Sequence, residues 1–161
     1  MPIIEISKGG VFRIGKNFMM VNYAVSNLIG RHQKCTFYIG ENATLQIGDN
    51  VGMSATSIVC MEKVLIGNNV RIGGNTVIYD TDFHSLNREQ RVKMVEDRAN
   101  TKHAKVLIED GVFIGAHTTI LKGVTIGENS ILGACSVVTK SIPRNEIWGG
   151  NPAKFIRKLD Q

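Results

Sequence analysis

An aliphatic residue returns at every sixth position through the second half of the chain. The series has no slip and comprises Ile108, Ile114, Ile120, Ile126, Leu132 and Val138. Four positions after each of the first five stands a small or β-branched residue: Val112, Thr118, Val124, Ser130 and Ser136. Because side chains two positions apart in a strand share a face, both series can point to the same interior. The period predicts short strands wound into stacked coils, since a helix would repeat at about 3.6 residues.

The same period occurs earlier in the chain, with less regularity. It is clear at Ile66, Ile72 and Ile78 and looser at Ile47, Met53 and Val59, with one extra residue before Ile66. Nearer the N-terminus the register becomes hard to follow. We therefore expect one all-β domain over residues 1–161, with irregular coils over 1–38 and regular coils over 39–83 and 106–142.

Two segments interrupt or end the repeat. Residues 84–105 are mostly polar and carry no six-residue period, which predicts a long inserted loop, and long loops are usually functional or disordered. Residues 148–161 are expected to form a short helix that caps the open end of the coil. Asn151 suits the N-cap and Pro152 the first helical position, and the apolar face would comprise Phe155, Ile156 and Leu159.

Composition narrows the class of protein. Hydrophobic residues make up 43% of the 161 residues and charged residues 20%, which is typical of a globular domain. The 17 glycines and 13 asparagines suit many turns that need a positive φ. No apolar run approaches the roughly 18 residues of a membrane span. The first residues mix charged with aliphatic side chains, so we expect no secretory signal and a cytoplasmic protein.

Charge, aromatic content and cysteine content bear on which partners and ligands the protein binds. The formal net charge of +5 suits any polyanionic partner. Aromatic residues are only 6%, and no basic stretch alternates with aromatics on which bases could stack, so we do not expect nucleic acid binding. Cys35, Cys60 and Cys135 lie far apart without a C-x-x-C pair, which predicts small buried residues in place of a disulfide framework or a zinc site.

One histidine stands where the strict repeat breaks. His84 follows Asp80 and Asp82, and one of these carboxylates is close enough in sequence to orient the ring. An imidazole titrates near neutral pH and can take a proton from a hydroxyl, which is the work of a general base. The alternative is a solvated turn with a structural histidine.

Two segments resemble a known family. Tyr79-Asp-Thr-Asp-Phe-His-Ser85 and Ile147-Trp-Gly-Gly-Asn-Pro-Ala-Lys154 are similar to the most recognisable segments of hexapeptide-repeat sugar O-acetyltransferases. These enzymes include the maltose, galactoside and polysaccharide-modifying acetyltransferases, and the resemblance extends over residues 39–160. It implies a left-handed parallel β-helix with about 18 residues in each triangular coil.

The resemblance also implies a reaction and an assembly. The acetyl group of acetyl-CoA would pass directly to a hydroxyl of a sugar or of a surface-polysaccharide precursor. His84 would be the general base, with no metal and no covalent acyl-enzyme. Family members form homotrimers with the active site between two subunits, so one subunit would supply His84 and another part of the cofactor wall.

Cofactor contacts follow from the same resemblance. Thr139 and Lys140 match the family segment that contacts the phosphates of coenzyme A, and Arg157 is a further basic candidate. Ala116 and Ala134 are small corner residues beside which the pantetheine arm would lie.

The last candidates concern the adenine and the acceptor. Trp148 and Pro152 would border the adenine ring. Some family members carry an asparagine one coil before the histidine, but residues 52–57 lack it, and Ser54 is the candidate to bind the acceptor in its place. This departure disfavours maltose or a galactoside as the acceptor.

Two other functions stay open. The γ-type carbonic anhydrases share the fold and bind zinc through three histidines, whereas His84 and His117 supply at most two ligands at recognisable positions here. The second alternative is a trimeric hexapeptide scaffold without catalysis, in which the basic insertion contacts a partner.

Overall fold

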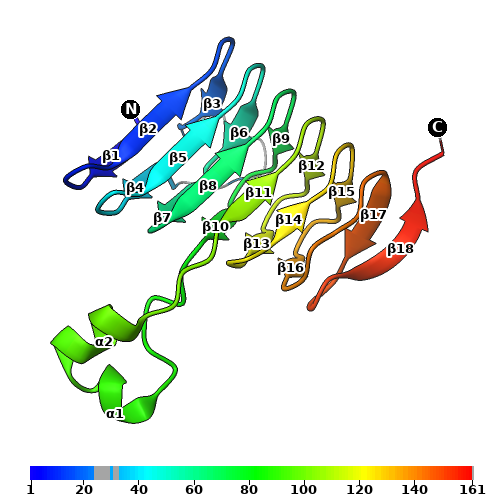
Figure 1. Ribbon diagram of the computed structural model, residues 1–161. Coiled ribbons are helices and arrows are strands. Elements are labelled where there is room, and N and C mark those ends of the chain that lie inside the picture. Colours follow the sequence, from blue (N-terminus) through cyan, green and yellow to red (C-terminus); the bar gives the residue numbers. More distant parts are fainter. Residues whose placement is uncertain (24–29, 31–32, 161) are drawn as a thin grey trace.

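The chain winds into a stack of triangular coils, described here by a computed structural model over residues 1–23, 30 and 33–160. Each full coil gives one strand to each of three sheets (Figure 1). The six-stranded sheet contains, in order, β1 (Ile3–Ile6), β4 (Thr36–Ile39), β7 (Ser57–Cys60), β10 (Val77–Tyr79), β13 (Thr119–Ile120) and β16 (Val137–Val138). The five-stranded sheet contains β2 (Val11–Ile14), β5 (Thr44–Ile47), β8 (Lys63–Ile66), β11 (Val106–Ile108) and β14 (Thr125–Ile126).

The third sheet has seven strands. In order it contains β3 (Met19–Val21), β6 (Gly52–Ser54), β9 (Arg71–Ile72), β12 (Phe113–Ile114), β15 (Ile131–Leu132), β17 (Glu146–Gly149) and β18 (Lys154–Lys158). Neighbouring strands are parallel throughout the three sheets except for the antiparallel pair β17 and β18. In the last regular coils the paired residues lie eighteen positions apart, as from 107 to 125 and from 119 to 137. This all-β architecture is consistent with a left-handed parallel β-helix.

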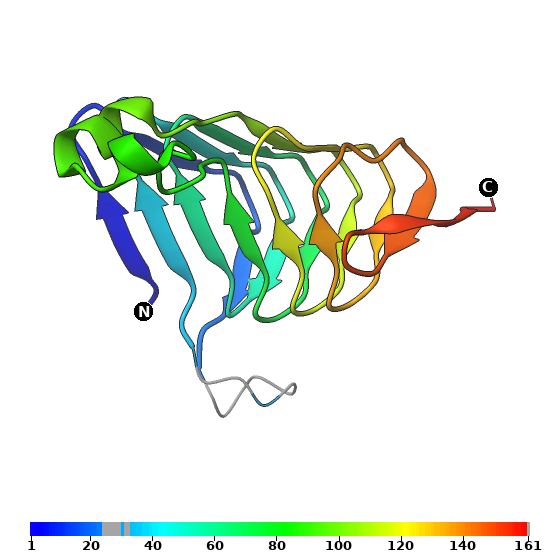
Figure 2. The same ribbon diagram turned by 90° about the horizontal axis from the view of Figure 1, so that it is seen from below.

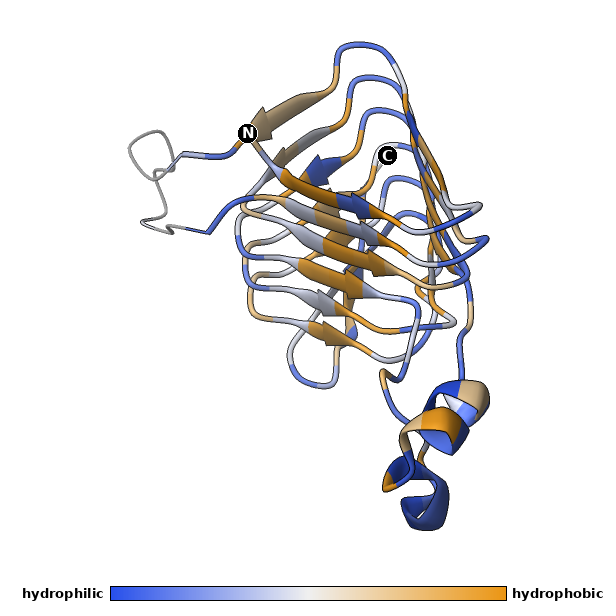
Figure 3. Ribbon diagram, turned by 90° about the vertical axis from the view of Figure 1, so that its left-hand side faces the viewer, coloured by the Kyte–Doolittle hydropathy of each residue, from blue (hydrophilic) through white to orange (hydrophobic). Residues whose placement is uncertain are grey.

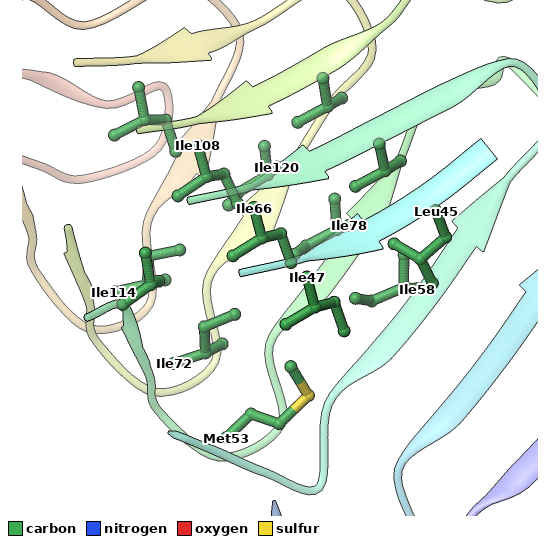
Figure 4. Close-up of a cluster of buried hydrophobic side chains, with 14 of the residues drawn as sticks. Leu45, Ile47, Met53, Ile58, Ile66, Ile72, Ile78, Ile108, Ile114 and Ile120 are labelled. Carbon is green, nitrogen blue, oxygen red and sulfur yellow. The ribbon is translucent and has the colours of Figure 1, made fainter. Parts of the chain in front are cut away.

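The core is the inside of the coil stack. All six aliphatic residues of the repeat are buried, and so are the five small or β-branched residues four positions later, which confirms the predicted inward series. Equivalent residues stack from coil to coil, as Ile47, Ile66 and Ile108 do in the five-stranded sheet (Figure 4). Such ladders bury each side chain against its counterparts above and below, where dispersion contacts are dense.

One strand of the earlier region is shifted from the predicted register. In β7 the inward residues are Ile58 and Cys60, both 0% exposed, whereas Val59 faces outward. The pairing of Ile58 with Phe37 and Ile78 fixes this register. A slip of one residue would turn every side chain of the strand to the other face.

Glycine follows the inward isoleucine because the next coil passes too close for a side chain. A Cβ at Gly73 would lie 2.5 Å from the backbone nitrogen of Ala116, and one at Gly115 equally close to that of Ala134. Asparagines take positive φ at another corner, where the Asn17 side chain donates to Oδ1 of Asn50 at 2.9 Å. The recurring Ile-Gly pairs therefore mark corners stacked directly on one another.

The first coil is more regular than the sequence predicted. Strand β1 pairs in register with β4, β2 with β5 and β3 with β6, so the expectation of irregular coils over residues 1–38 is wrong for these three strands. Their periodicity is obscured because this end coil leaves inward residues such as Ile4 and Ile6 half exposed, so little burial constrains them. The rest of the interval includes 24–29 and 31–32, which lie outside the described residues.

The C-terminal segment is a hairpin and not the predicted capping helix. Strand β18 pairs antiparallel with β17, Trp148 opposite Phe155 and Gly149 opposite Lys154. The free edge of the seven-stranded sheet offers ladder hydrogen bonds, and this tertiary pairing overrides the local helix signals at Asn151 and Pro152. Residue 161, the last of the predicted helix, lies outside the described residues.

The inserted segment folds into two short helices, α1 (Arg88–Arg91) and α2 (Met94–Asn100). They project from one corner of the coil stack, and α1 is strongly hydrophilic (Figure 3). Across these two helices, Asp97 is the one buried residue. Over the residues that the structure describes, no helix is both long and apolar enough to cross a membrane.

Candidate active site

The ring of His84 is held by a carboxylate of the insertion. Nδ1 of His84 lies 2.7 Å from Oδ2 of Asp97, and the histidine side chain remains 66% exposed. A carboxylate at neutral pH can only accept, so Nδ1 carries the proton and Nε2 keeps its lone pair. None of the described residues hydrogen-bonds to Nε2, which leaves this nitrogen as a proton acceptor facing solvent.

Asp97 is itself fixed by the start of α2 and by the backbone. Its second oxygen accepts the N–H of Ser85 at 2.6 Å, and the residue stands in the first turn of α2, where the helix dipole favours an anion. The hydrogen bond from His84, followed by that from the Ser85 backbone, lowers the pKa of Asp97 below its ordinary value. The carboxylate is therefore ionised across the neutral range.

The rest of the insertion folds around this pair. The Ser85 hydroxyl donates to Oε1 of Gln90 at 2.7 Å, and Nη1 of Arg91 donates to the Ser85 carbonyl at 2.8 Å. Asn87 caps α1 by accepting the N–H of Glu89. These bonds order the chain on both sides of His84, which explains how a segment with almost no apolar core holds a defined geometry.

Asp80 does not orient the ring, contrary to the sequence prediction. It is 0% exposed and accepts three backbone N–H groups, from Met61, Glu62 and Lys63, at 2.7 to 2.8 Å. The corner between β7 and β8 leaves these donors without strand partners, and the carboxylate satisfies all three. Its role is to hold the preceding coil.

Asp82 does not reach the ring either. Its carboxylate lies 3.4 Å from Nζ of Lys122 in the next coil, and the buried Oδ2 makes no hydrogen bond with the described residues. The backbone N–H of Asp82 donates to the Lys102 carbonyl. Asp82 therefore belongs to the neck of the insertion, where residues 80–82 pair with residues 102–104. The carboxylate partner of His84 is thus Asp97, thirteen residues after the histidine, and not one of the two aspartates that precede it.

Sequence reasoning missed Asp97 because no spacing rule applies inside the insertion. The segment has neither the six-residue period nor a long amphipathic helix that would bring two positions together. The available signal was Glu96-Asp97 at the start of a short helical stretch, a typical place for acidic residues. That signal indicates a helix start and does not point to His84.

Four of the remaining candidates, Ser54, Ala116, Ala134 and Lys140, lie in two rows at opposite edges of the six-stranded sheet. Ser54, Ala116 and Ala134 lie where strands β6, β12 and β15 turn into that sheet. The other row lies where β10 and β16 leave the six-stranded sheet. It comprises the segment that leads from β10 to His84, and Lys140 after β16. Within one coil the two edges are separated by up to about 20 Å, given roughly 3.3 Å per strand residue. A single chain therefore does not gather these residues into one site.

The cofactor candidates differ in exposure. Thr139, Lys140 and Pro152 are exposed, as is Arg157, whose guanidinium lies 3.4 Å from Asp160. Trp148 is half-buried against the core. Its indole N–H donates to Glu146 at 2.7 Å, and its ring meets that of Phe155 edge to face. The indole therefore serves the hairpin, and only part of it faces solvent.

Ser54 belongs to a hollow of its own. This hollow, of about 610 Å³, runs over the outer face of the seven-stranded sheet, with Met19, Arg71 and Phe113 among its lining residues. Met19 and Phe113 are about half exposed or more, so much of the lining is apolar. The structure does not bring Ser54 to His84 within one chain.

His117, the second histidine considered as a metal ligand, lies apart from His84. His117 lies at the corner after β12 with Nδ1 3.0 Å from the Asn75 amide, at the opposite edge of the sheet from the neck of the insertion. Among the described residues, no three or more His, Cys, Asp or Glu side chains are placed to hold one metal ion.

Comparisons with known proteins identify the repeat. Residues 105–140 match the family model described as bacterial transferase hexapeptide (six repeats). Galactoside O-acetyltransferase of Lactococcus lactis subsp. lactis is 39% identical over 157 residues, which are 98% of this chain and 68% of that protein. The solved structure of a galactoside acetyltransferase in complex with coenzyme A superposes with a TM-score of 0.61 at 28% identity, covering 92% of this chain and 66% of the other.

The similarity extends to a second activity class over a shorter stretch. Gamma carbonic anhydrase 2, mitochondrial, of Arabidopsis thaliana is 35% identical over 57% of this chain and 37% of its own length. Seven of the curated relatives are longer proteins, of which the matching part of this chain spans 37 to 61%. The match to the Lactococcus protein covers nearly the whole chain and two thirds of that relative. Together with the stacked coils, it shows that this chain belongs to the hexapeptide-repeat acetyltransferase family.

Proposed function

We propose that this protein transfers the acetyl group of acetyl-CoA to a hydroxyl group of a sugar or of a surface-polysaccharide precursor. The observation that carries the proposal is the 2.7 Å hydrogen bond between His84 and Asp97, which fixes the protonated nitrogen and leaves the other one free. The family membership supplies the reaction class, and the paired imidazole supplies the base that this class needs.

The reaction begins with proton transfer to Nε2. As the acceptor oxygen bonds to the thioester carbonyl carbon, its proton passes to Nε2 of His84, and the imidazolium is stabilised by the Asp97 carboxylate. The tetrahedral intermediate then collapses with cleavage of the carbon–sulfur bond. The proton on Nε2 passes to the departing sulfur, which restores the neutral imidazole and yields free coenzyme A and the acetyl ester.

The positions of the two rows support an active site shared between subunits of a homotrimer. His84 and Lys140 lie along one edge of the six-stranded sheet, whereas Ala116 and Ala134 lie along the other. A neighbouring subunit that places its Ala116 and Ala134 next to His84 brings the two halves of the active site together. The thioester arm then runs along the small corner residues of one subunit toward the imidazole of the next.

Lys140 and Thr139 are the residues we propose for the phosphates of coenzyme A. Both are exposed, and Lys140 makes no ion pair with any described residue, so its ammonium group is available. Arg157 is a weaker candidate because it already pairs with Asp160.

A mixing experiment tests the shared site. His84→Ala removes the base, and Ala134→Trp fills the corner where the arm would lie. Each variant alone should lack thiol release from acetyl-CoA with an acceptor that the wild type uses. Co-expressed in equal amounts, the two should recover about a quarter of wild-type activity, because one interface in four pairs an intact His84 with an intact corner.

The acceptor for this experiment comes from a panel of sugars and sugar nucleotides. Equal inactivity of the mixture and the single variants would show that both halves come from one chain. Absence of thiol release by the wild type with every acceptor of the panel would instead favour the scaffold alternative.

A further inference from the structure

A cleft of about 630 Å³ lies between the insertion and the corners of the first three coils. Its floor includes Lys8 and Glu41, in the turns after β1 and β4, and its roof includes Arg98 of α2. In Figure 2 the two helices lie at the end of the stack that holds β1 and β4, which is how the insertion comes to cover these turns. Neither the repeat nor the residues discussed for the reaction explain this cleft.

The charges in the cleft favour an anion. Lys8 and Arg98 are exposed, and neither forms an ion pair with any of the described residues. Glu41 is the single carboxylate among the lining residues of the cleft, and it too is unpaired within the described chain. Two cationic groups held against one anionic group give an excess of positive charge in a partly enclosed space, where a bound anion is screened less than at an open surface.

His103 adds an unused hydrogen-bonding atom to the wall of the cleft. The residue forms an isolated antiparallel β-bridge with Thr81 in the neck of the insertion, and it lines the cleft. Its Nδ1 is buried and has no hydrogen-bond partner among the described residues. Buried polar nitrogens are rarely left without a partner, and a site that binds a ligand is one reason for such an exception.

Aromatic surface lies beside these charges and next to the proposed base. Tyr38 and Phe83 both line the cleft, and Phe83 is 49% exposed. Flat rings of this kind pack against the apolar face of a sugar ring. Phe83 directly precedes His84, so their Cα atoms are about 3.8 Å apart. A saccharide in the cleft is therefore adjacent to the segment that carries the imidazole.

We propose that this cleft binds the anionic group, a carboxylate or a phosphate, of the acceptor, so that the acceptor is an acidic or phosphorylated saccharide. Arg98 and Lys8 pair with the anion, Phe83 packs against the sugar ring, and Glu41 is free to accept from a ring hydroxyl. The inference rests on the proposed acetyl transfer for its biological meaning, but the binding itself does not depend on turnover.

Thiol release with matched sugars tests the acceptor class in the full-length protein. The acceptors are galactose, galacturonate and galactose 1-phosphate, with acetyl-CoA held at saturation. We expect kcat/KM for at least one anionic sugar to exceed that for galactose about tenfold or more, since charge-assisted hydrogen bonds are roughly twice as strong as neutral ones. Comparison of galacturonate with galactose 1-phosphate distinguishes a site for a carboxylate from a site for a phosphate. A kcat/KM for galactose equal to or above both anionic sugars overturns the proposal.

Binding without acetyl-CoA provides the second readout. Calorimetric titration with trigalacturonate and with galactose 1-phosphate should detect at least one of the two, and Arg98→Gln and Lys8→Gln should each weaken it about tenfold. Arg88→Gln removes the same charge from exposed α1 outside the cleft and should change binding less than twofold. Absence of binding by both probes, or equal weakening by Arg88→Gln, overturns the proposal. Binding without thiol release by any acceptor would refute the acetyl transfer while leaving the anion site intact.

Discussion

Oδ2 of Asp97 accepts a hydrogen bond from Nδ1 of His84 over 2.7 Å, although the two residues are separated by thirteen positions and a helix. The second oxygen of the same carboxylate accepts the N–H of Ser85. The ring and the backbone beside it are thus held by one group. The insertion therefore sets the tautomer of His84 and leaves Nε2 facing solvent.

Replacing Asp97 by asparagine should impair turnover more than binding. An amide can donate to Nδ1, which favours the tautomer with the proton on Nε2 and removes the base. We expect kcat to fall at least about tenfold, with KM for acetyl-CoA changed less than threefold. Steady-state kinetics of thiol release measures both.

Asp82→Asn is the matched control for Asp97→Asn. Asp82 pairs with Lys122 and does not touch the ring, so kcat should stay within about threefold of wild type. A larger loss in Asp82→Asn than in Asp97→Asn would mean that the wrong carboxylate has been assigned to His84.

Asp97 should also make stability depend on acidic pH. The His84 and Ser85 hydrogen bonds lower its pKa in the folded state below the ordinary 3.8, so folding favours the ionised form. This contribution is complete above the unfolded pKa and is lost as the pH falls through the lower folded pKa. The difference in unfolding free energy between wild type and Asp97→Asn should therefore shrink below about pH 4. Denaturant unfolding at a series of pH values checks this, and a difference that grows on acidification would refute it.

The coils could be predicted from the sequence because their determinants are local and repeated. Each inward isoleucine and the small residue four positions later follow from the period alone, as Ile114 and Thr118 illustrate. The pairing of His84 with Asp97 could not be predicted, since it depends on the path of an aperiodic segment. The C-terminal hairpin was missed for a related reason. Phe155 and Ile156 fit a helical face, but β17 offers an open edge that local sequence does not reveal.

Asp80 should prove important for stability. Asp80→Ala leaves three backbone N–H groups, those of Met61, Glu62 and Lys63, without their carboxylate acceptor. We expect the free energy of unfolding to fall by about 1 to 3 kcal/mol, because three backbone hydrogen bonds to one buried carboxylate are lost. Denaturant titration measures the loss. The fully exposed Asp160 is the control, and Asp160→Ala should show no measurable change. Equal midpoints for the two variants would contradict the role assigned to Asp80.

The three cysteines should differ in reactivity. Burial, followed by the nearby Asp80 carboxylate, raises the pKa of the Cys60 thiol to about 12, and burial also raises that of Cys35. Cys135 is exposed. At pH 8 a dithiodipyridine titration should detect one fast thiol in the native protein, because the thiolate is the reactive form. In denaturant it should detect three, and Cys135→Ser should remove the fast phase. Two fast thiols in the native wild type would contradict this assignment.

The most direct test of the account is the turnover number of His84→Ala, measured as thiol release from acetyl-CoA with an acceptor that the wild type uses. The ring is exposed, so the variant should keep the wild-type oligomeric size and unfolding midpoint. Loss of the base should lower kcat at least about a hundredfold. A kcat within threefold of wild type, in a protein of unchanged size and stability, would contradict the central claim.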